Sequence, residues 1–450
     1  MYIAGLDIGT TGCKCTVFDG DGHLLGKAYR DYPVQRAVGG HEIDISAMMD
    51  GVYAVFMEMA SRYPDIGGIG VTSFGETFIC VDRAGEPLHP AMLYTDPRGR
   101  KECLELVQKI GERKIAEITG LRPHEMYSIS KIMWLKRNKP EVLEAAGIDE
   151  KLLSAPVPTG TIAGKLLASV AKESGLKPDT QVVSVSHDQV SAAVGAGAFD
   201  ASVAVDGAGT VECLTPVYDK IPDIDVMYQG YFSVVPYVIP GKYVAYAFSY
   251  TGGALIQWCA DTLAKEEKRL AKEQGISVNE LLEHAYASEE PSGLLVLPHF
   301  AGAATPYMDT GSKGAVLGLT AATTVADIYR GCMEGVVYEM YLNMQALWQS
   351  GICFDRIHAT GGGAWSKEWM QMKADVLDIP ITSLKTVDAG TVGSAMLTGI
   401  AVGLFKDLND AAAHMVEKTE SYEPRREMHD KYMEIYKRYE KVYQVVRPLV

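Results

Sequence analysis

Two short segments of this chain, nearly two hundred residues apart, contain the residue types that suit phosphate binding. In each, an apolar run ends in an aspartate, Asp7 or Asp206, and a turn of small residues follows. Glycine in such a turn lets the backbone approach a ligand closely, and a threonine hydroxyl can donate a hydrogen bond. Two such turns facing each other would hold the β- and γ-phosphates of a nucleotide, which predicts phosphoryl transfer. The residues assigned to this task are Gly9, Thr10, Thr11, Gly209 and Thr210.

Asp7 and Lys14 add charge to the first of these turns. A carboxylate beside phosphates is unfavourable unless a cation lies between them, so Asp7 is predicted to hold Mg²⁺, directly or through water. Lys14 is predicted to neutralise phosphate charge. The alternative roles are an aspartate that caps a turn and a lysine on a solvated strand.

Asp188 follows an apolar run at residues 181–187 that is predicted to be a buried strand. Side chains at the carboxyl end of such a strand face the ligand-binding crevice of an α/β sheet. There Asp188 can act as a general base and remove the proton of an attacking hydroxyl. Capping of the helix that follows is an equally good explanation of this aspartate. His187 is expected to be packed or hydrogen-bonded rather than catalytic.

Other turns offer further binding groups. Residues 361–364, Gly-Gly-Gly-Ala, open a predicted helix, and their bare backbone suits a flat adenine or ribose. They form neither a Walker loop nor a dinucleotide-binding glycine pattern. Glu76, Thr77, Asp96 and Arg98 are candidates for binding a polyhydroxylated ligand through hydrogen bonds. Ordinary turn polarity is the simpler explanation of those four residues taken alone.

The elements that must position these groups follow a repeated order. Each half begins with a strand, a turn and a strand, and later presents a strand that ends in a polar or glycine turn before a helix. This indicates an internal duplication of an α/β unit, with domains over residues 1–199 and 200–450. Apolar residues spaced by three and four over 428–446 predict an amphipathic helix that packs on the second domain. The other predicted strands cover 3–6, 14–18, 23–32, 68–72, 77–82 and 356–360, and the other predicted helices cover 45–63, 99–119, 130–138, 190–196 and 364–377.

Length and composition limit the class of protein. A chain of 450 residues is too long for one ordinary core, and 47% hydrophobic with 22% charged residues is normal for a globular protein. A net charge of −15 argues against nucleic acid as a partner. No apolar run is long enough to span a membrane, and the first residues lack the features of a signal peptide. We therefore expect a cytoplasmic protein whose eight cysteines are reduced.

Several motifs together resemble the FGGY family of carbohydrate kinases, which includes xylulose, glycerol and gluconate kinases. Residues 126–138 fit the family's first signature throughout, and residues 314–319 with 327–334 fit most of the second, departing at Gly331 and Cys332. Residues 361–364 with Trp369, Gln371 and Asp375 match its adenosine motif, and residues 388–395 resemble its closing segment. The resemblance covers nearly the whole chain.

The resemblance implies two actin-like (ribonuclease H-like) α/β domains with an interdomain cleft that closes on sugar and ATP. Asp188 falls on the family's catalytic aspartate, and Asp7 is again the expected Mg²⁺ ligand. The implied nucleotide-binding residues are Gly9, Thr10, Thr11, Lys14, Gly209, Thr210, Gly253, Gln257, Gly362, Gly363, Ala364 and Lys367. The implied substrate-binding residues are Glu76, Thr77, Asp96, Arg98 and Gln189.

Two departures from the family bear on the substrate. Gly75 stands where glycerol kinases have the arginine of Arg-Glu-Thr, and residues 74–76 also differ from the Gln-Met-His of xylulose kinases. The stretch after Pro140 is shorter than in the family, with its flanks fused through residues 141–146. The sequence thus predicts an ATP-dependent kinase of a sugar or polyol. The alternative is a sugar- or nucleotide-sensing relative with weakened catalysis, and a homodimer is the expected assembly if the chain assembles.

Overall fold

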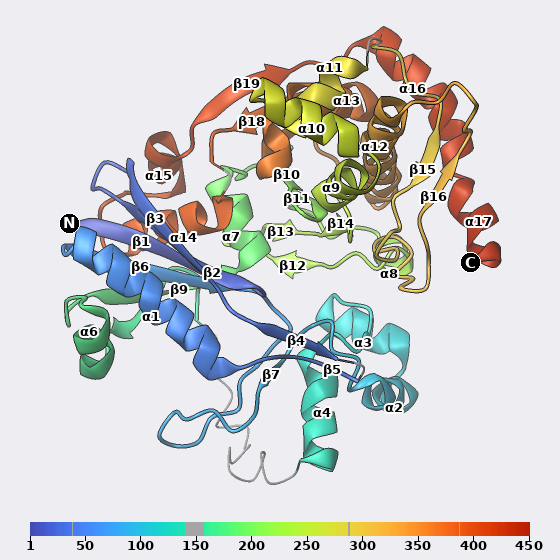
Figure 1. Cartoon of the computed structure of the whole chain (residues 1–450). Coiled ribbons are helices and arrows are strands. Elements are labelled where there is room, and N and C mark those ends of the chain that lie inside the picture. The colour runs from blue at the N-terminus through green and yellow to red at the C-terminus, as the bar shows by residue number, and fades with distance from the viewer. Residues whose placement is uncertain (38, 140–156, 287–288, 387) are drawn as a thin grey trace. The chain divides into compact units, whose positions relative to one another are not determined.

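The computed structural model describes residues 1–37, 39–139, 157–286, 289–386 and 388–450 (Figure 1). The chain forms two compact units. The first contains Met1–Gly197 with Asp388–Val416, and the second contains Ala198–Val387 with Glu417–Val450. The domain boundary predicted between residues 199 and 200 places residues 388–416 in the second domain. In the structure, these residues belong to the first compact unit. The predicted shortening at 141–146 lies outside the described residues.

The first unit is built on one mixed sheet with the order β3-β2-β1-β6-β9-β8. β1 and β2 form an antiparallel hairpin, β6 runs parallel to β1, and β9 runs parallel to β6. The strands are β1 (Tyr2–Ile8), β2 (Gly12–Phe18), β3 (Leu24–Asp31), β6 (Ile66–Ser73), β8 (Thr161–Lys165) and β9 (Gln181–His187). The carboxyl ends of the parallel strands β1, β6 and β9 therefore lie at one edge of this sheet.

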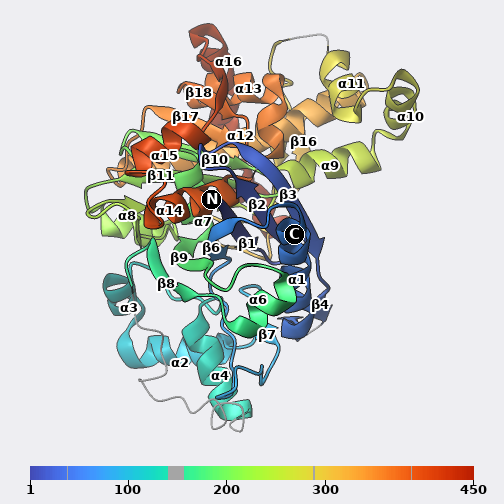
Figure 2. The same cartoon turned by 90° about the vertical axis from the view of Figure 1, so that its left-hand side faces the viewer.

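Helices cover both faces of the first sheet (Figures 1 and 2). α1 (Ile45–Arg62) packs on β2 and β3 and contacts α6 (Ala168–Ser174), while α7 (Asp188–Gly195) and α14 (Ala389–Ala401) lie side by side on the other face. The predicted helix over 45–63 is confirmed as α1. It buries residues spaced by three and four, among them Met48, Val52, Val55, Phe56 and Met59, as an amphipathic helix must.

The remaining elements of the first unit depart in two places from the sequence-based prediction. Gly111, at φ 93°, divides the helix expected over 99–119 into α2 (Arg100–Ile110) and α3 (Glu112–Thr119), because that backbone conformation cannot continue a helix. The strand expected over 77–82 is wrong, since Val81 makes only an isolated bridge to Pro87. The other elements are β4 (Val34–Ala37), β5 (Gly40–Ile43), β7 (Ala91–Met92), α4 (Ser128–Asn138) and α15 (Leu408–Met415).

The second unit repeats the strand pattern of the first. Its main sheet has the order β12-β13-β11-β10-β17-β18-β19, in which β10 and β11 form an antiparallel hairpin and β17 and β18 run parallel to β10. This agrees with the internal duplication inferred from the sequence. The strands are β10 (Val203–Ala208), β11 (Glu212–Tyr218), β12 (Val235–Pro236), β13 (Tyr243–Val244), β14 (Ala247–Ser249), β17 (Arg356–Thr360), β18 (Ile381–Leu384) and β19 (Lys418–Tyr422), with β15 (Leu295–Leu297) and β16 (Ala315–Leu317) as a separate pair.

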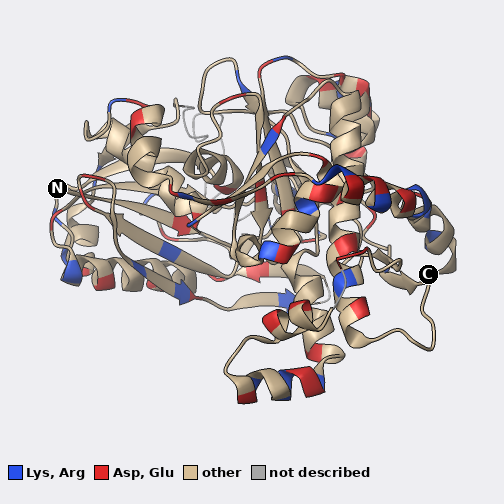
Figure 3. Cartoon of the chain, turned by 90° about the horizontal axis from the view of Figure 1, so that it is seen from above, with Lys and Arg blue, Asp and Glu red and all other residues tan. Residues whose placement is uncertain are grey.

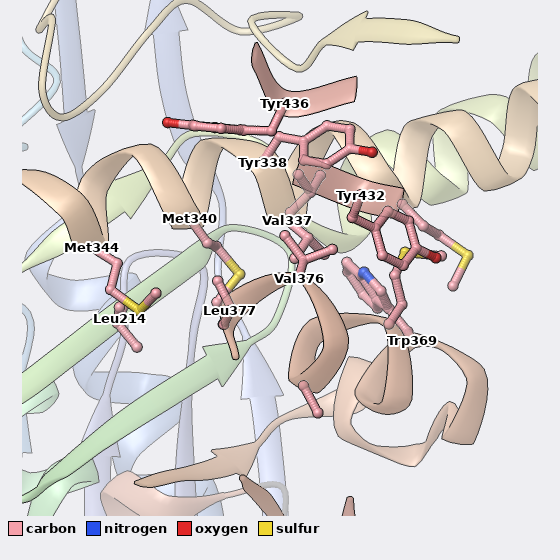
Figure 4. Close-up of a cluster of buried hydrophobic side chains, with 14 of the residues drawn as sticks. Leu214, Val337, Tyr338, Met340, Met344, Trp369, Val376, Leu377, Tyr432 and Tyr436 are labelled. Carbon is pink, nitrogen blue, oxygen red and sulfur yellow. The ribbon is translucent and has the colours of Figure 1, made fainter. Parts of the chain in front are cut away.

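A long helix, α12 (Val325–Gln349), is central to the core of the second unit. Tyr338 of α12, Trp369 and Val376 of α13 (Lys367–Leu377), and Tyr432 of α16 (Arg426–Tyr439) are among the buried side chains (Figure 4). The predicted tail helix is present as α16 and α17 (Val442–Val446), and its tyrosines face this core. The other helices are α8 (Ile224–Gln229), α9 (Gly253–Thr262), α10 (Lys265–Gln274), α11 (Val278–Ala285), and the 3₁₀ turns η2 (Gly362–Trp365) and η3 (Arg447–Leu449).

Acidic and basic side chains are interspersed along the helices (Figure 3). Within the described ranges, no helix has the length and apolar character needed to cross a bilayer. All eight cysteines are free, and only Cys353 among them is exposed.

Candidate functional site

Asp7 lies near the carboxyl end of β1, beside Lys14 of β2 and Thr72 of β6 in the sheet register. The turn that follows is closed by a hydrogen bond from the Gly9 amide to the Gly12 carbonyl at 2.9 Å. Tyr32 fixes the same turn, because its hydroxyl donates to the Gly9 carbonyl and its amide donates to the Thr11 carbonyl. The first predicted phosphate turn is thus a fixed loop at the edge of the sheet where β1, β6 and β9 end.

Asp188 is the first residue of α7, directly after β9, as the sequence predicted. One of its carboxylate oxygens, Oδ1, accepts from the Gln189 amide at 2.6 Å and lies 3.0 Å from Nδ1 of His187. The helix N-cap is His187, whose ring accepts from the Gln189 amide, so helix capping does not fully occupy the Asp188 carboxylate. A second oxygen remains for other chemistry.

The crossing of α7 and α14 brings a third carboxylate to this edge. A Cβ atom on Gly393 would lie 1.9 Å from the Ser191 carbonyl oxygen, and one on Gly195 would lie 2.0 Å from that of Ala389, so the helices touch through bare backbone. At the start of α14, the position of a Cβ on Gly390 is 3.5 Å from Oδ2 of Asp7. Asp388, two residues before this glycine, acts electrostatically on Asp7 and pairs with Lys14, so it also lies at this edge, although no role was predicted for it from the sequence.

Burial raises the pKa values of Asp7 and Asp188. The pKa of Asp7 is raised to about 6, first by burial and then by Asp188, while Lys14 opposes the shift. Burial also raises the pKa of Asp188 to about 6. The ammonium of Lys14 lies 2.8 Å from Oδ1 of Asp388. Two partly buried carboxylates, of which Asp188 disfavours the charge of Asp7, suit a divalent cation with oxygen ligands, so these residues fit Mg²⁺.

The predicted substrate residue Glu76 lies within electrostatic range of Asp188, and Thr77 follows it in the chain. Glu76 adopts φ 59°, a left-handed conformation that is strained for a residue with a side chain. Its pKa is raised by burial and by Asp188, and lowered by His187 and Lys131. Within the described part of the chain, the buried Thr77 hydroxyl has no hydrogen-bond partner. A strained residue beside an unsatisfied hydroxyl marks this turn as a candidate ligand contact.

Lys131 holds this turn in place, which the sequence analysis did not anticipate. It is fully buried, and its ammonium donates to the carbonyls of Glu76 at 3.0 Å and of Met126 at 2.6 Å. Tyr94 was also missed: its pKa is raised by burial, lowered by Arg36, and raised by Asp188 and Glu76, so its hydroxyl lies among these charges. Neither residue stands out in the sequence, because Lys131 reaches the site from α4 and Tyr94 from a turn, both distant from it along the chain.

Asp96 and Arg98 form hydrogen bonds and ion pairs with residues of the first unit. Oδ2 of Asp96 accepts from the His41 amide at 2.8 Å and from Nη2 of Arg98 at 2.5 Å. The same guanidinium reaches Glu42 at 2.6 Å and lies 5.0 Å from the Trp134 ring. These contacts order the β5 region near the predicted sugar-binding turns.

In the second unit, the turn at 209–211 joins β10 and β11 and is bonded to the start of α9. The Gly253 amide donates to the Gly209 carbonyl at 2.9 Å, and the Ala254 amide donates to the Thr210 carbonyl at 3.0 Å. A Cβ on Gly253 would lie only 2.7 Å from that Gly209 oxygen, so glycine is required there. The structure thus joins the second predicted phosphate turn to Gly253.

The glycine turn at 361–364, which follows β17, lies beside Ala208 at the end of β10. A Cβ on Gly361 would lie 2.6 Å from the Ala208 carbonyl oxygen, and one on Gly363 would lie 3.0 Å from the Ala208 side chain. Together these segments line a cavity of about 1260 Å³ within the second unit. Its walls include Gly209, Thr210, Gly253, Gln257, Gly362, Gly363 and Lys367, all predicted nucleotide contacts. Ala364, by contrast, is buried behind its neighbours.

Two of the predicted nucleotide contacts form exposed polar pairs at the cavity wall. Nε2 of Gln257 donates to Asp261 at 2.9 Å, and the ammonium of Lys367 lies 2.5 Å from Glu420. Exposed pairs of this kind are weakly held, so both side chains are free to exchange their partners for a ligand.

A buried cluster of charged side chains lies next to the second predicted phosphate turn. The Lys373 ammonium donates to Asp206 at 2.6 Å and also to Glu212, and all three side chains are almost completely buried. Burial raises the pKa of Glu212 well above its usual value, with Asp206 adding to the shift. The cluster connects β10, β11 and α13, the elements that carry the two turns of the cavity.

Comparison with known proteins gives a single family for the whole chain. The model of the FGGY family of carbohydrate kinases, N-terminal domain, matches residues 2–147 and 139–195, and that of the C-terminal domain matches residues 208–402. This chain belongs to the FGGY family of carbohydrate kinases. It is a carbohydrate kinase with the two-domain actin-like fold.

Among FGGY relatives, the chain is 24% identical to a xylulose kinase of Staphylococcus epidermidis, with 99% of this chain and 97% of the relative covered. It is 26% identical to a glycerol kinase of Carboxydothermus hydrogenoformans, with 92% of each covered. Among solved structures, it is similar to a ligand-bound xylulose kinase of Lactobacillus acidophilus, at a TM-score of 0.86, 20% identity, and 99% and 98% coverage. It is also similar to Plasmodium falciparum glycerol kinase with ADP, at a TM-score of 0.81, 18% identity and 98% coverage of both chains.

The two matches to the FGGY N-terminal domain meet at residues 139–147. That junction coincides with the stretch where the sequence predicts a shortened insertion. The alignment to the xylulose kinase also spans 501 positions, more than the 450 residues of this chain, so the kinase relative carries additional segments.

Proposed function

We propose that this FGGY kinase transfers the γ-phosphoryl group of ATP to a hydroxyl of a sugar or polyol, with Asp188 as general base. The observation that carries the proposal is the position of Asp188: a partly buried carboxylate at the end of β9, beside Asp7 and the first phosphate turn. With a pKa of about 6, Asp188 is ionised at neutral pH and still basic enough to accept a hydroxyl proton.

The neighbours of Asp188 orient it for proton transfer. The Gln189 amide fixes one carboxylate oxygen, which leaves the other to face the substrate hydroxyl. Burial lowers the pKa of His187, so its imidazole is neutral and adds no competing positive charge. This arrangement supports a base with a defined orientation rather than a freely rotating carboxylate.

Asp7 would hold Mg²⁺, which supplies charge neutralisation for the phosphates when it is bound. Lys14, paired with Asp388, supplies a second positive charge at the same edge. The turn at 209–211 and Gly253 would bind the phosphates of ATP in the second unit. Transfer requires that these phosphates reach Asp188.

The sugar or polyol would bind next to Asp188 through Glu76, Thr77 and Gln189. The buried, unpartnered Thr77 hydroxyl supports this, because a ligand hydroxyl would satisfy it. Asp96 and Arg98 support the neighbouring turn through their mutual ion pair.

Replacement of Asp188 by Asn tests the proposal. Asn keeps the shape of the side chain and can still accept from the Gln189 amide, but it cannot take up a proton. We expect kcat to fall by about 10²–10⁴-fold while ATP binding, measured by calorimetry, changes less than twofold. Asp65→Asn, an exposed aspartate of the same unit, is the matched control and should leave kcat unchanged. Unaltered turnover in Asp188→Asn would refute the assignment.

A sensor with weakened catalysis is the second candidate, and the junction at residues 139–147 favours it. ADP release should be measured over a panel of ketoses, polyols and sugar acids. Phosphorylation of any panel member supports the kinase. ATP binding without phosphorylation of any of them supports the sensor.

A further inference from the structure

Lys373 of α13 carries a charge in the core of the second unit, where none of its surface is exposed. Its ammonium donates to Asp206 of β10 and to Glu212 of β11, and it lies 4.5 Å from the centre of the Trp369 ring. Withdrawing a charge from water costs several kcal/mol, which good partners must offset. A lysine enclosed in this way cannot touch a ligand, so any part that it has in binding acts through its partners.

The two carboxyl partners lie on the strands that the second predicted phosphate turn connects. Asp206 and Glu212 stand on one face of this hairpin, because Ala208, two residues after Asp206, pairs with Glu212. The position of a Cβ on Gly252 is 2.8 Å from Oε2 of Glu212, and the Gly252 amide donates to the Thr210 carbonyl at 3.0 Å. The carboxyl groups therefore pack against the backbone that holds the turn.

The charges of this cluster balance when Glu212 carries a proton. Lys373 bonds to Oδ2 of Asp206 and to Oε1 of Glu212. Within the described residues, neither the backbone nor a third side chain donates to the remaining oxygens, Oδ1 of Asp206 and Oε2 of Glu212. The two carboxyl groups interact by a hydrogen bond, which needs a proton on one of them, and burial raises the pKa of Glu212 well above its usual value. One ammonium then faces one carboxylate.

The first unit places its lysine differently. There Lys14 lies opposite Asp7 on the neighbouring strand, and 33% of its side chain is exposed, so a ligand can reach it. In the second unit the residue opposite Asp206 is the apolar Leu214. The positive charge comes instead from α13, as Lys373, and it does not line the cavity. The second unit thus neutralises its aspartate from inside the core.

A negative charge buried next to a turn that holds phosphates would repel them strongly, because little water screens it. We propose that Lys373 is a positioning residue that cancels the charge of Asp206 and so allows the turn at 209–211 to hold the phosphates of a nucleotide. The effect acts on the phosphates and not on the nucleoside. The inference rests on the proposed ATP-dependent function and deepens it.

Calorimetry on the whole protein tests the inference, with ADP, AMP and adenosine as probes. Lys373→Met keeps the length of the side chain and leaves one carboxylate uncompensated. We expect ADP binding to weaken about tenfold, AMP binding to weaken less, and adenosine binding to change less than about twofold, because the repulsion grows with the charge of the ligand. Lys220→Met, which removes an exposed lysine of the same unit, is the matched control and should leave all three affinities unchanged. Circular dichroism verifies that each variant is folded.

A second substitution separates charge from packing. In Lys373→Met combined with Asp206→Asn, the cluster is neutral again although the ion pair is gone. Its ADP affinity should return to within about threefold of that of the unaltered chain, since neutral groups can replace a buried ion pair at little cost. A purely structural brace would be weakened further by the second change. Glu212→Gln imitates the protonated carboxyl and should bind ADP as the unaltered chain does. If Lys373→Met does not fold, Lys373→Gln, which keeps a donor without the charge, takes its place.

The outcomes distinguish this inference from the function on which it rests. Equal losses of ADP and adenosine affinity in the folded Lys373 variant, or no loss at all, would overturn the inference and leave the kinase proposal standing. So would a double variant that recovers no ADP affinity. A changed ADP affinity in Glu212→Gln would overturn the neutral state of the cluster. If the unaltered chain binds none of the three probes, the proposed ATP-dependent function falls as well.

Discussion

At the scale of single residues, Lys131 is a buried lysine whose ammonium bonds to two carbonyls rather than to a carboxylate. Burial lowers its pKa to about 8. In the unfolded chain a lysine keeps a pKa of about 10.4. Between these two values the unfolded state binds more protons than the folded state, so the contribution of Lys131 to stability rises with pH.

Lys131→Met should remove this pH dependence. The free energy of unfolding of the unaltered chain, relative to the variant, should increase between pH 8 and pH 10.5 by about 3 kcal/mol at most. Urea unfolding at several pH values in this window measures the difference. The exposed Lys172→Met variant controls for the loss of one lysine charge. Parallel curves for the unaltered chain and Lys131→Met would contradict the prediction.

Local sequence predicted the site residues that follow strands. Asp7 and Asp188 each end an apolar run, and strand ends meet at one edge of a sheet, so their approach follows from topology. Lys131 and Tyr94 could not be found in this way. Lys131 reaches Glu76 from α4 and Tyr94 from a turn, and the positions of both depend on long-range packing. The left-handed conformation of Glu76 has no signal in its side-chain type either.

At the scale of elements, the crossing of α7 and α14 sets the geometry of the site. Both helices start at an acidic residue, and their backbones touch through Gly195 and Gly393. Each carbonyl lies where the partner glycine would carry a Cβ. This contact fixes the separation of the two helix starts, and therefore of Asp188 and Asp388.

Gly393→Ala should force these helices apart. The added Cβ would lie 1.9 Å from the Ser191 carbonyl oxygen, an overlap that only a backbone shift can relieve. We expect a loss of about 3 kcal/mol in the free energy of unfolding, with reduced kcat because Asp188 moves. Urea unfolding and steady-state kinetics measure the two effects. Gly20→Ala, where the nearest atom is 3.7 Å away, should change stability by less than about 0.5 kcal/mol. Equal free energies of unfolding for Gly393→Ala and Gly20→Ala would contradict the prediction, because α7 and α14 would then move apart without loss of stability.

Helix periodicity predicted α1 and the tail helices well, since their apolar faces meet a core. The strand expected over 77–82 failed for a physical reason. Its apolar residues pack in an irregular turn beside Met92 and Leu135, and in the described structure their strand pairing is limited to the isolated bridge between Val81 and Pro87. Composition alone does not distinguish such a turn from a strand.

At the scale of the whole molecule, the duplicated sheet explains why the sequence contains two similar turns that are predicted to bind phosphate. Each follows the first strand of its unit, and each unit then adds two parallel strands in the same order. The repeat does not reveal that residues 388–416 belong to the first unit. Residues 198–387 of the second unit separate α14 in sequence from the strands on which it packs.

α14 packs directly against glycines of the first sheet. A Cβ on Gly5 would lie 1.9 Å from the Thr391 carbonyl oxygen, and one on Gly70 would lie 2.3 Å from the Thr398 hydroxyl. Without the helix, these strands would expose bare backbone and the apolar residues that now face Val392, Ala395 and Met396. The first unit therefore needs a segment that the chain supplies only after residue 387.

A fragment of residues 1–197 should consequently fail to unfold cooperatively in urea, as monitored by circular dichroism. The same fragment joined to residues 388–416 through about twenty glycine and serine residues should recover a single sharp transition, because a linker of this length spans such a unit without strain. It should also regain Asp388 beside Lys14, the ion pair at the start of α14. A joined fragment carrying Gly393→Ala serves as control and should fold less stably than the joined fragment itself. Cooperative folding of residues 1–197 alone would mean that α14 only covers a finished sheet; failure of that fragment with recovery in the joined one means that the helix completes the core on which Asp7 and Asp188 depend.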